Sequence, residues 1–89
     1  METVCIVGAS RGIGLGFARA YVERGDRVFA TVRSRDNEAI RELESAYPER
    51  FTVLLMDVTD RDSVQQAAQQ LMRERDTLDI LINNAGMST

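Results

Sequence analysis

The sequence predicts an α/β fold in three layers, with a parallel sheet of four strands in the order 3-2-1-4. Two observations indicate it. Short apolar, β-branched runs alternate with amphipathic helical patterns, and the connections between them are short. Parallel neighbours need a crossover, which a helix supplies, and right-handed crossovers leave this doubly wound order as the leading one. With 89 residues and 44% hydrophobic content, one domain with a single, barely sufficient core is expected over residues 1–89.

Four segments are predicted as strands because they are apolar and rich in β-branched residues. The first, "TVCIV", is nearly continuously apolar, as in a strand that is covered on both faces. The four segments are Thr3–Val7, Arg27–Val32, Phe51–Met56 and Asp79–Asn83.

A helix is predicted after the first strand. Ile13, Phe17, Ala20 and Tyr21 recur on one stripe, which we expect to face the sheet. Gly25 follows the pattern and is the expected C-terminal stop.

Two more helices are predicted between the remaining strands. The second takes Ser34 or Asp36 as its cap and ends at Pro48. The third opens with Thr59 and Asp62 in capping-box spacing. The apolar positions expected to be buried are Ile40, Leu43 and Tyr47 in the second helix and Val64, Ala68 and Leu71 in the third.

Composition excludes several classes of function. All eleven basic residues are arginines scattered among fourteen acids, and the net charge is −3, which argues against a nucleic-acid surface. Without histidine or lysine, the chain has no histidine acid/base chemistry, no histidine metal site and no Schiff-base chemistry. No metal site is expected.

The single cysteine and the N-terminus bear on the compartment. Cys5 lies in an apolar run, so we expect a small buried side chain, no disulfide framework and a reducing compartment. "METVCIVG" lacks a basic region followed by a long apolar stretch, and no run approaches a membrane span. We therefore expect a cytoplasmic protein.

The turn after the first strand, "GASRGIG", predicts a dinucleotide site. Gly8, Gly12 and Gly14 allow a tight turn and a close approach of a pyrophosphate to the N-terminus of a helix. The spacing is G-x-x-x-G-x-G, which differs from the general Rossmann fingerprint G-x-G-x-x-G. The alternative is a strand-to-helix connection that binds no ligand.

Two arginines favour NADP(H) over NAD(H). Arg33 follows the second strand nineteen positions after Gly14, where an acid would accept ribose hydroxyls and an arginine would pair with a 2′-phosphate. Arg11 lies in the glycine-rich turn. The alternative is that both are solvated surface side chains.

The motifs together resemble one family. "GASRGIG", "DV" at Asp57 and Val58, and "NNAG" at Asn83–Gly86 resemble, in this order and spacing, the short-chain dehydrogenase/reductase family along the whole chain. The first 34 residues also resemble the branch that includes C-factor-type bacterial signalling proteins.

The resemblance implies roles for residues around the adenosine half of a cofactor. Ser10 and Arg11 would lie near the adenosine ribose and its 2′-phosphate, which Arg33 would also hold. Ile13 would offer its backbone N–H to the pyrophosphate.

The other two motifs would contact the base and a ribose. Asp57 would bind the adenine amino group, and Val58 would pack on the ring. Asn83, Ala85 and Gly86 would lie along the ribose, with the asparagine side chains also tying the fourth strand to its neighbours. The alternative for "NNAG" is a purely structural strand end.

The chain departs from the family in its catalytic residues. The family uses a downstream serine and a Tyr-x-x-x-Lys pair, in which lysine lowers the tyrosine pKa. Here Tyr21 and Tyr47 are followed four positions later by Gly25 and Phe51, and there is no lysine. No catalytic residue is therefore predicted, and the expectation is an N-terminal portion of a reductase that is truncated before the catalytic half and inactive alone.

The fourth strand would be an exposed edge with free backbone groups. Pairing of two copies through this edge predicts a homodimer or higher oligomer. Two classes of function remain open: part of an NADP(H)-dependent oxidoreductase, or a non-catalytic nucleotide-binding, redox-sensing or self-assembling half-Rossmann module. A truncated gene product without a selected function is a third possibility.

Overall fold

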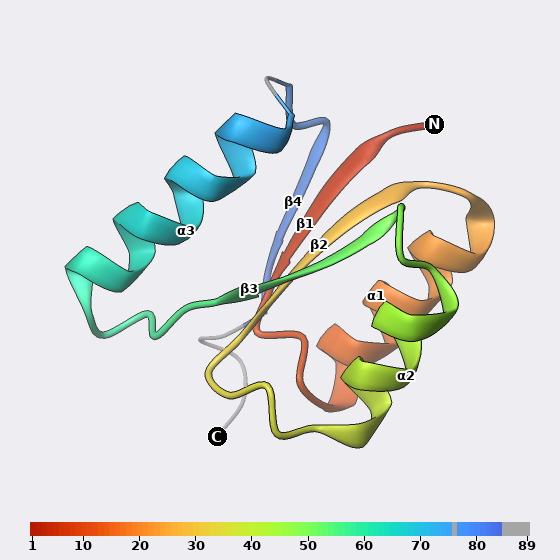
Figure 1. Ribbon diagram of the computed structural model, residues 1–89, viewed down its shortest axis with the longest axis horizontal. Helices are drawn as coiled ribbons and strands as arrows, with labels where there is room; N and C mark the ends of the chain where they lie inside the picture. Colours follow the sequence, from red (N-terminus) through yellow and green to blue (C-terminus); the bar gives the residue numbers. More distant parts are fainter. Residues whose placement is uncertain (76, 85–89) are drawn as a thin grey trace.

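The computed structural model describes residues 1–75 and 77–84, which form a parallel α/β sheet with helices on both faces. The strand order is β3-β2-β1-β4, as predicted. Helices α1 and α2 cover one face and α3 covers the other (Figure 1). The elements are β1 (Thr3–Val7), α1 (Gly12–Arg24), β2 (Arg27–Val32), α2 (Glu38–Ala46), β3 (Phe51–Leu55), α3 (Arg61–Glu74) and β4 (Ile80–Asn83).

The register brings the carboxyl ends of the strands to one edge of the sheet. Val7 of β1 pairs with Thr31 of β2 and with Asn83 of β4. Val32 of β2 pairs with Leu55 of β3. The loops that follow all four strands therefore start side by side, which is where doubly wound sheets bind ligands.

Side chains alternate between two cores along β1, β2 and β3, as the period of two requires. Val4 and Ile6 of β1 pack with the helices α1 and α2, whereas Cys5 lies in a smaller cluster beside α3. Burial raises the pKa of the Cys5 thiol to about 11. The predicted burial of this cysteine is confirmed.

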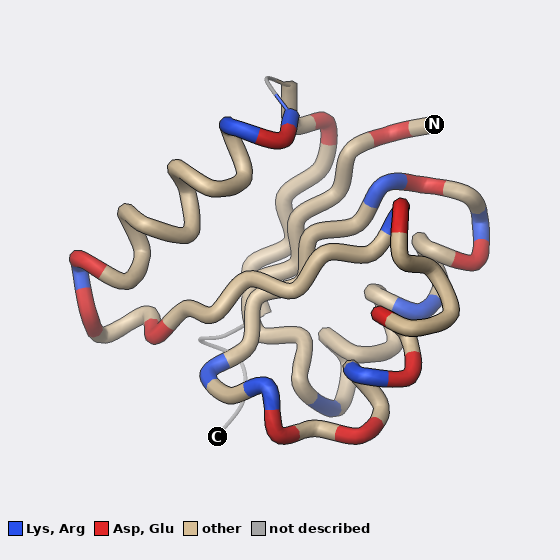
Figure 2. Tube along the Cα trace, in the orientation of Figure 1, with Lys and Arg blue, Asp and Glu red and all other residues tan. Residues whose placement is uncertain are grey.

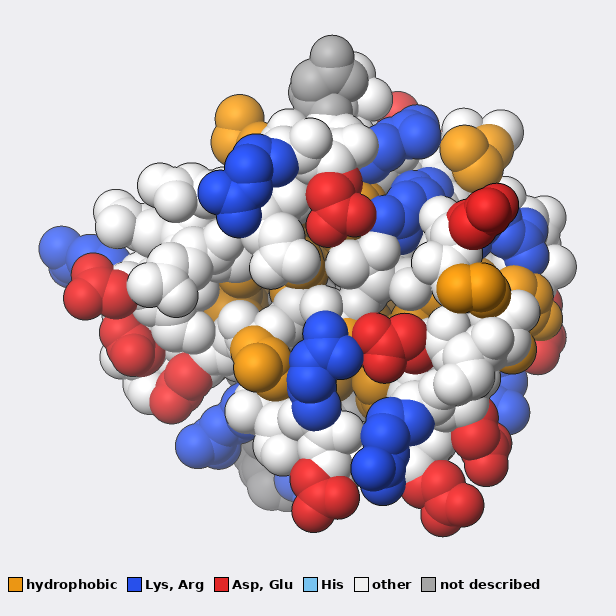
Figure 3. Space-filling model, in the orientation of Figure 1, with side chains coloured by type: hydrophobic (Ala, Val, Ile, Leu, Met, Phe, Trp, Pro, Cys, Tyr) orange, Lys and Arg blue, Asp and Glu red, His pale blue; other side chains and the backbone are white. Residues whose placement is uncertain are grey.

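Charged residues lie on helices, loops and strand ends and are missing from the middle of the strands (Figure 2). On the face that Figure 3 presents, arginines and acidic residues lie next to one another. Within residues 1–75 and 77–84, no helix combines the length and the apolar character that a membrane crossing needs.

The predicted buried face of α1 is wrong. Ile13 is 61% exposed, Phe17 is 39% exposed and Ala20 is exposed, while Tyr21 is half-buried. The buried residues are instead Gly14, Ala18 and Val22, at a spacing of four. Small side chains let this helix lie close to the sheet, so Ile13 and Phe17 point outward, while Leu15 and Tyr21 pack against the edge of the core. Gly25 ends the helix with φ of 106°, as predicted.

The predicted cap of α2 is also wrong, although its buried face is confirmed. Asn37 is the cap and accepts a hydrogen bond from the Ile40 amide. Ser34 instead accepts a hydrogen bond from the Asp36 amide in the preceding turn. Ile40 and Leu43 are buried, and Tyr47, half-buried, follows the last helical residue.

Helix α3 differs from the prediction at its start and on its buried face. Asp60 is the cap, because Thr59 is held by Asp57 through two hydrogen bonds. Ala67 is the buried residue, whereas Val64 and Ala68 are exposed and Leu71 is half-buried. The helix is turned so that Val64, Ala68 and Leu71 line a groove that opens toward β4.

Identical substitutions on the two faces of α1 distinguish the predicted packing from the observed one. Ala18→Leu should lower the free energy of unfolding by about 1–3 kcal/mol because it overpacks a fully buried position. Ala20→Leu should change it by less than about 0.5 kcal/mol because Ala20 is exposed. Urea unfolding followed by circular dichroism measures both, and a larger effect at Ala20 would contradict the observed orientation.

Candidate dinucleotide site

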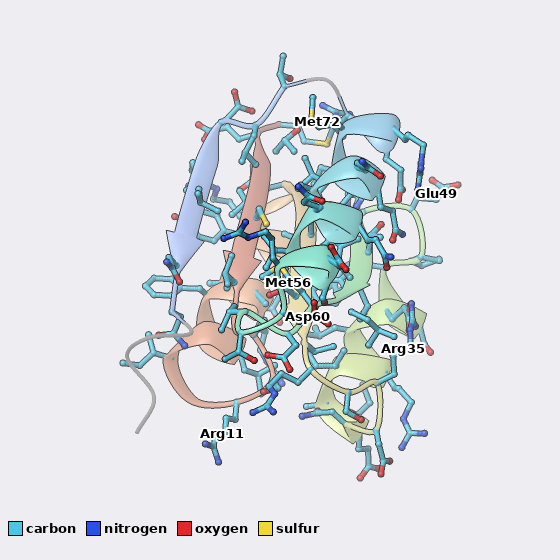
Figure 4. All side chains as sticks on the ribbon, turned by 90° about the vertical axis from the view of Figure 1, so that its left-hand side faces the viewer. Arg11, Arg35, Glu49, Met56, Asp60 and Met72 are labelled. Carbon is cyan, nitrogen blue, oxygen red and sulfur yellow. The ribbon has the colours of Figure 1, made fainter. Side chains whose placement is uncertain are left out.

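A pocket of about 490 Å³ lies at the carboxyl ends of the strands. Its walls are the glycine-rich loop after β1, the end of β2 and the loop between β3 and α3. Arg11 and Asp60 lie at this end of the molecule, whereas Met72 and Glu49 lie at the opposite end (Figure 4). The lining residues are Gly8, Ser10, Arg11, Thr31, Val32, Arg33, Met56, Asp57, Val58, Thr59 and Asn84.

The end of β2 holds the start of the glycine-rich loop. The Gly8 amide donates to the Thr31 hydroxyl at 3.0 Å, and the Ala9 amide donates to the Thr31 carbonyl at 2.9 Å. Gly8 has φ of 83° and Gly12 has φ of 61°. Both lie in the left-handed region that other residues rarely adopt, so glycine is required for the turn.

Helix α1 begins directly against the end of β1. A Cβ atom on Gly14 would lie 2.1 Å from the Gly8 carbonyl oxygen and 2.7 Å from Nδ2 of Asn84. Nδ2 of Asn84 donates to that carbonyl at 3.1 Å, and the Asn84 amide donates to the Val7 carbonyl at 2.9 Å. Gly14 is therefore needed for packing, and Asn84 fastens the end of β4 to the loop.

The first turn of α1 suits an anion. Arg11 is the cap residue, and its side chain makes no capping hydrogen bond. The first turn contains no acidic residue. Backbone N–H groups at such a helix start, together with the helix dipole, favour a phosphate.

The pocket combines two cations with an acid and an exposed apolar side chain. Arg11 and Arg33 come from different loops, and within residues 1–75 and 77–84 neither forms an ion pair. Hydrogen bonds from the Thr59 hydroxyl and amide, with a smaller contribution from the Arg33 charge, lower the pKa of Asp57. Val58 is 49% exposed and offers an apolar surface.

The structure brings about half of the predicted site residues into this pocket. Four others lie outside its lining: Gly12 and Ile13 are exposed at the start of α1, Gly14 is buried behind the loop, and Asn83 is exposed at the end of β4. Ala85 and Gly86 lie outside the described residues. The predicted residues that line the pocket are Gly8, Ser10, Arg11, Arg33, Asp57 and Val58.

Sequence reasoning missed the residues that shape the loops. Thr31 looks like an ordinary β-branched strand residue, and its hydrogen bonds depend on the register with β1. Asn37 holds Ser10 from a different loop, a contact that local sequence does not signal. The tie that the resemblance implied for the asparagine side chains of "NNAG" is present at Asn84, whose Nδ2 group donates to the Gly8 carbonyl.

A parallel sheet in this order, with a glycine-rich turn and a cationic pocket at the strand ends, defines a Rossmann-type dinucleotide-binding fold. The family model for short chain dehydrogenase matches residues 2–89. The chain belongs to the short-chain dehydrogenase/reductase family.

The chain is similar to several known members of this family. Sorbitol dehydrogenase of Cereibacter sphaeroides is 35% identical over 86 residues, 97% of this chain and 33% of that protein. An NADP-dependent 3-hydroxy acid dehydrogenase of Escherichia coli is 31% identical over 85 residues, 96% of this chain and 34% of that protein. The structure of a carbonyl reductase from Pseudomonas aeruginosa in complex with NADP matches with a TM-score of 0.83 at 37% identity, covering 93% of this chain and 37% of that one. The chain thus spans about a third of the length of these relatives.

Two glycines of α1 provide a matched test of the close approach at Gly14. Gly14→Ala should lower the free energy of unfolding by at least about 3 kcal/mol, the upper end of the usual cost of overpacking. Gly16→Ala should raise it by about 0.5–1 kcal/mol, since alanine is the better helix former and a Cβ there meets nothing within 4 Å. Chemical denaturation measures both, and a Gly14→Ala variant as stable as the parent would show that α1 does not begin against Gly8.

Proposed function

We propose that this chain binds NADP(H) in preference to NAD(H) and forms the adenosine-binding, N-terminal portion of a reductase-type oxidoreductase. The observation that supports this most strongly is the presence of Arg11 and Arg33 on the walls of one pocket. A 2′-phosphate is a strong partner for two unpaired guanidinium groups. Relatives whose names or structures include NADP support the same preference.

The residues of the glycine-rich loop and of the end of β2 would hold the phosphates. Ser10, Arg11 and Arg33 would surround the 2′-phosphate and the adenosine ribose. The amides at Gly12–Gly14, with that of Ile13 foremost, would face the pyrophosphate, since the start of α1 has no side-chain cap.

The remaining site residues would contact the base and a ribose. Asp57, kept ionised by Thr59, would accept a hydrogen bond from the adenine amino group. The exposed Val58 side chain would pack on the ring. Asn83, Ala85 and Gly86 would lie along the ribose.

When bound, the nicotinamide would exchange a hydride with the substrate, donating it as NADPH or accepting it as NADP+, and this sequence holds no tyrosine–lysine pair for the proton transfer. Tyr21 packs on Phe17 with ring centroids 6.4 Å apart and lies under the Arg24 guanidinium. Tyr47 lies under the guanidinium of Arg50. Neither tyrosine lines the pocket and no lysine accompanies them, so we propose that the chain alone is inactive as an oxidoreductase.

A calorimetric titration with NADPH and NADH tests the binding function. We expect saturable binding that favours NADPH, and we expect Arg33→Ala to weaken NADPH binding by about 10- to 100-fold, the value of a charged hydrogen bond. NADH binding should change little.

Arg19→Ala is the matched control for this titration. Arg19 is an exposed arginine of α1 that does not line the pocket, so its loss should leave the preference for NADPH unchanged. Equal binding of the two nucleotides, or no binding of either, would refute the proposed cofactor.

Self-assembly through β4 is a second candidate function, with a second copy of this chain as the partner. Among the described strands, β4 pairs with β1 alone, and Leu81 is 60% exposed. Beside it lies a largely apolar groove of about 500 Å³ between α3 and the sheet. An unpaired edge next to uncovered apolar side chains favours strand pairing between copies.

Redox sensing receives less support. The thiol of Cys5 is buried, and its pKa of about 11 leaves almost no thiolate at neutral pH. A free, buried cysteine suits the reducing cytoplasm, which we propose as the location.

Substitutions at the two edges of the sheet test the assembly. If copies pair through β4, Leu81→Arg should convert the oligomer into a monomer, because it places a charge in the apolar contact. Leu55→Arg, at the exposed position of the opposite edge strand β3, should leave the oligomer intact. Light scattering at micromolar concentration measures both, and a monomeric parent chain would refute self-assembly.

A further inference from the structure

Asn37 joins the two loops from which the pocket arginines come. Its Nδ2 group donates to the Ser10 carbonyl at 2.7 Å, and its Oδ1 atom accepts from the Ile40 amide at 3.0 Å. One partner is a carbonyl and the other is an N–H, so the two contacts fix the orientation of the amide group. Asn37 therefore caps α2 and at the same time fastens the glycine-rich loop.

The segment that carries Arg33 is anchored on both sides. Before it, the Val32 carbonyl accepts from the Met56 amide at 2.9 Å. After it, Arg35 is bound to Glu44 and to the Val53 carbonyl. The segment then ends at Asn37, so Asn37 presents a fixed point to the neighbouring loop.

The glycine-rich loop is held less firmly at its far end. Thr31 and Asn84 fasten Gly8 and Ala9. Between these contacts and the start of α1, Ser10 is held by the bond from Asn37. Arg11 follows Ser10 directly, so this bond sets the position of Arg11 on the wall of the pocket.

We propose that Asn37 is a positioning residue for cofactor selectivity, which sets the separation of Arg11 and Arg33 around the 2′-phosphate. This rests on the proposed NADP(H) function. Asn37 does not line the pocket itself, so it acts through the loop. A loop that is already ordered loses less conformational freedom on binding, which raises the affinity for its ligand. The affinity should rise most for NADP(H), because both arginines would contact its 2′-phosphate.

Asn37→Ser separates the two roles of the asparagine. Serine is an equally good helix cap, but it has no amide to reach the Ser10 carbonyl. We expect the affinity for NADPH to fall about five- to tenfold, the value of one ordinary hydrogen bond. Affinity for NADH should fall less than about twofold, and the thermal midpoint should stay close to that of the parent.

Ile40→Val is the control for general loosening of α2. It weakens the packing of a buried residue in the first turn and leaves both bonds of Asn37 in place. We expect a lower thermal midpoint and an unchanged ratio of NADPH to NADH affinity. A changed ratio in this variant would overturn the role of Asn37.

The outcomes separate this inference from the function on which it rests. If the parent chain prefers NADPH and Asn37→Ser keeps the parent ratio, the inference is wrong while the proposed function stands. If the parent chain shows no preference for NADPH, the proposed function is wrong and the inference falls with it. A reduced preference for NADPH in Asn37→Ser, with the parent ratio kept in Ile40→Val, supports both.

Discussion

The contact of α1 with the Gly8 carbonyl is the constraint on which the rest of the site depends. Because Gly14 has no side chain, the helix can begin against the end of β1, with its free amides at the edge of the sheet. The same carbonyl accepts a hydrogen bond from the Asn84 side chain, and the Gly8 amide donates one to the Thr31 hydroxyl. Gly8 thus connects the ends of β1, β2 and β4. The pocket lies next to that junction, between the loops that follow β1, β2 and β3.

The sheet could be predicted because each of its strands, and each helix between them, has a recognisable pattern in the local sequence. Each strand is a short β-branched run, the helices between them are amphipathic, and crossover handedness then leaves few strand orders. The glycine-rich turn and Arg33 could be predicted for a related reason. Both follow strands directly, and in a parallel sheet the carboxyl ends of the strands lie together.

The buried faces of α1 and α3 and the N-terminal caps of α2 and α3 could not be predicted, because they are decided by contacts between distant segments. The pattern of α1 favours burial of its large residues Ile13 and Phe17, but the close approach to β1 selects the small ones, Gly14 and Ala18. Before α2, several polar residues can serve as a cap. Asn37, the residue that caps the helix, also binds Ser10, which lies 27 positions earlier in the sequence. Local sequence does not reveal this second contact.

The two faces of the sheet are covered unequally. Helices α1 and α2 enclose the larger core, whereas α3 encloses a small one and leaves the groove toward β4 open. The pocket is built mainly from the ends of β1, β2 and β3, and the free edge lies beyond β1 on the other side. Among the described residues, Asn84 alone belongs to the pocket and also follows the edge strand. The pocket proposed for the nucleotide and the groove proposed for strand pairing therefore adjoin each other: Thr31 and Met56 line both, and the Asn84 bond to Gly8 joins the end of β4 to the glycine-rich loop.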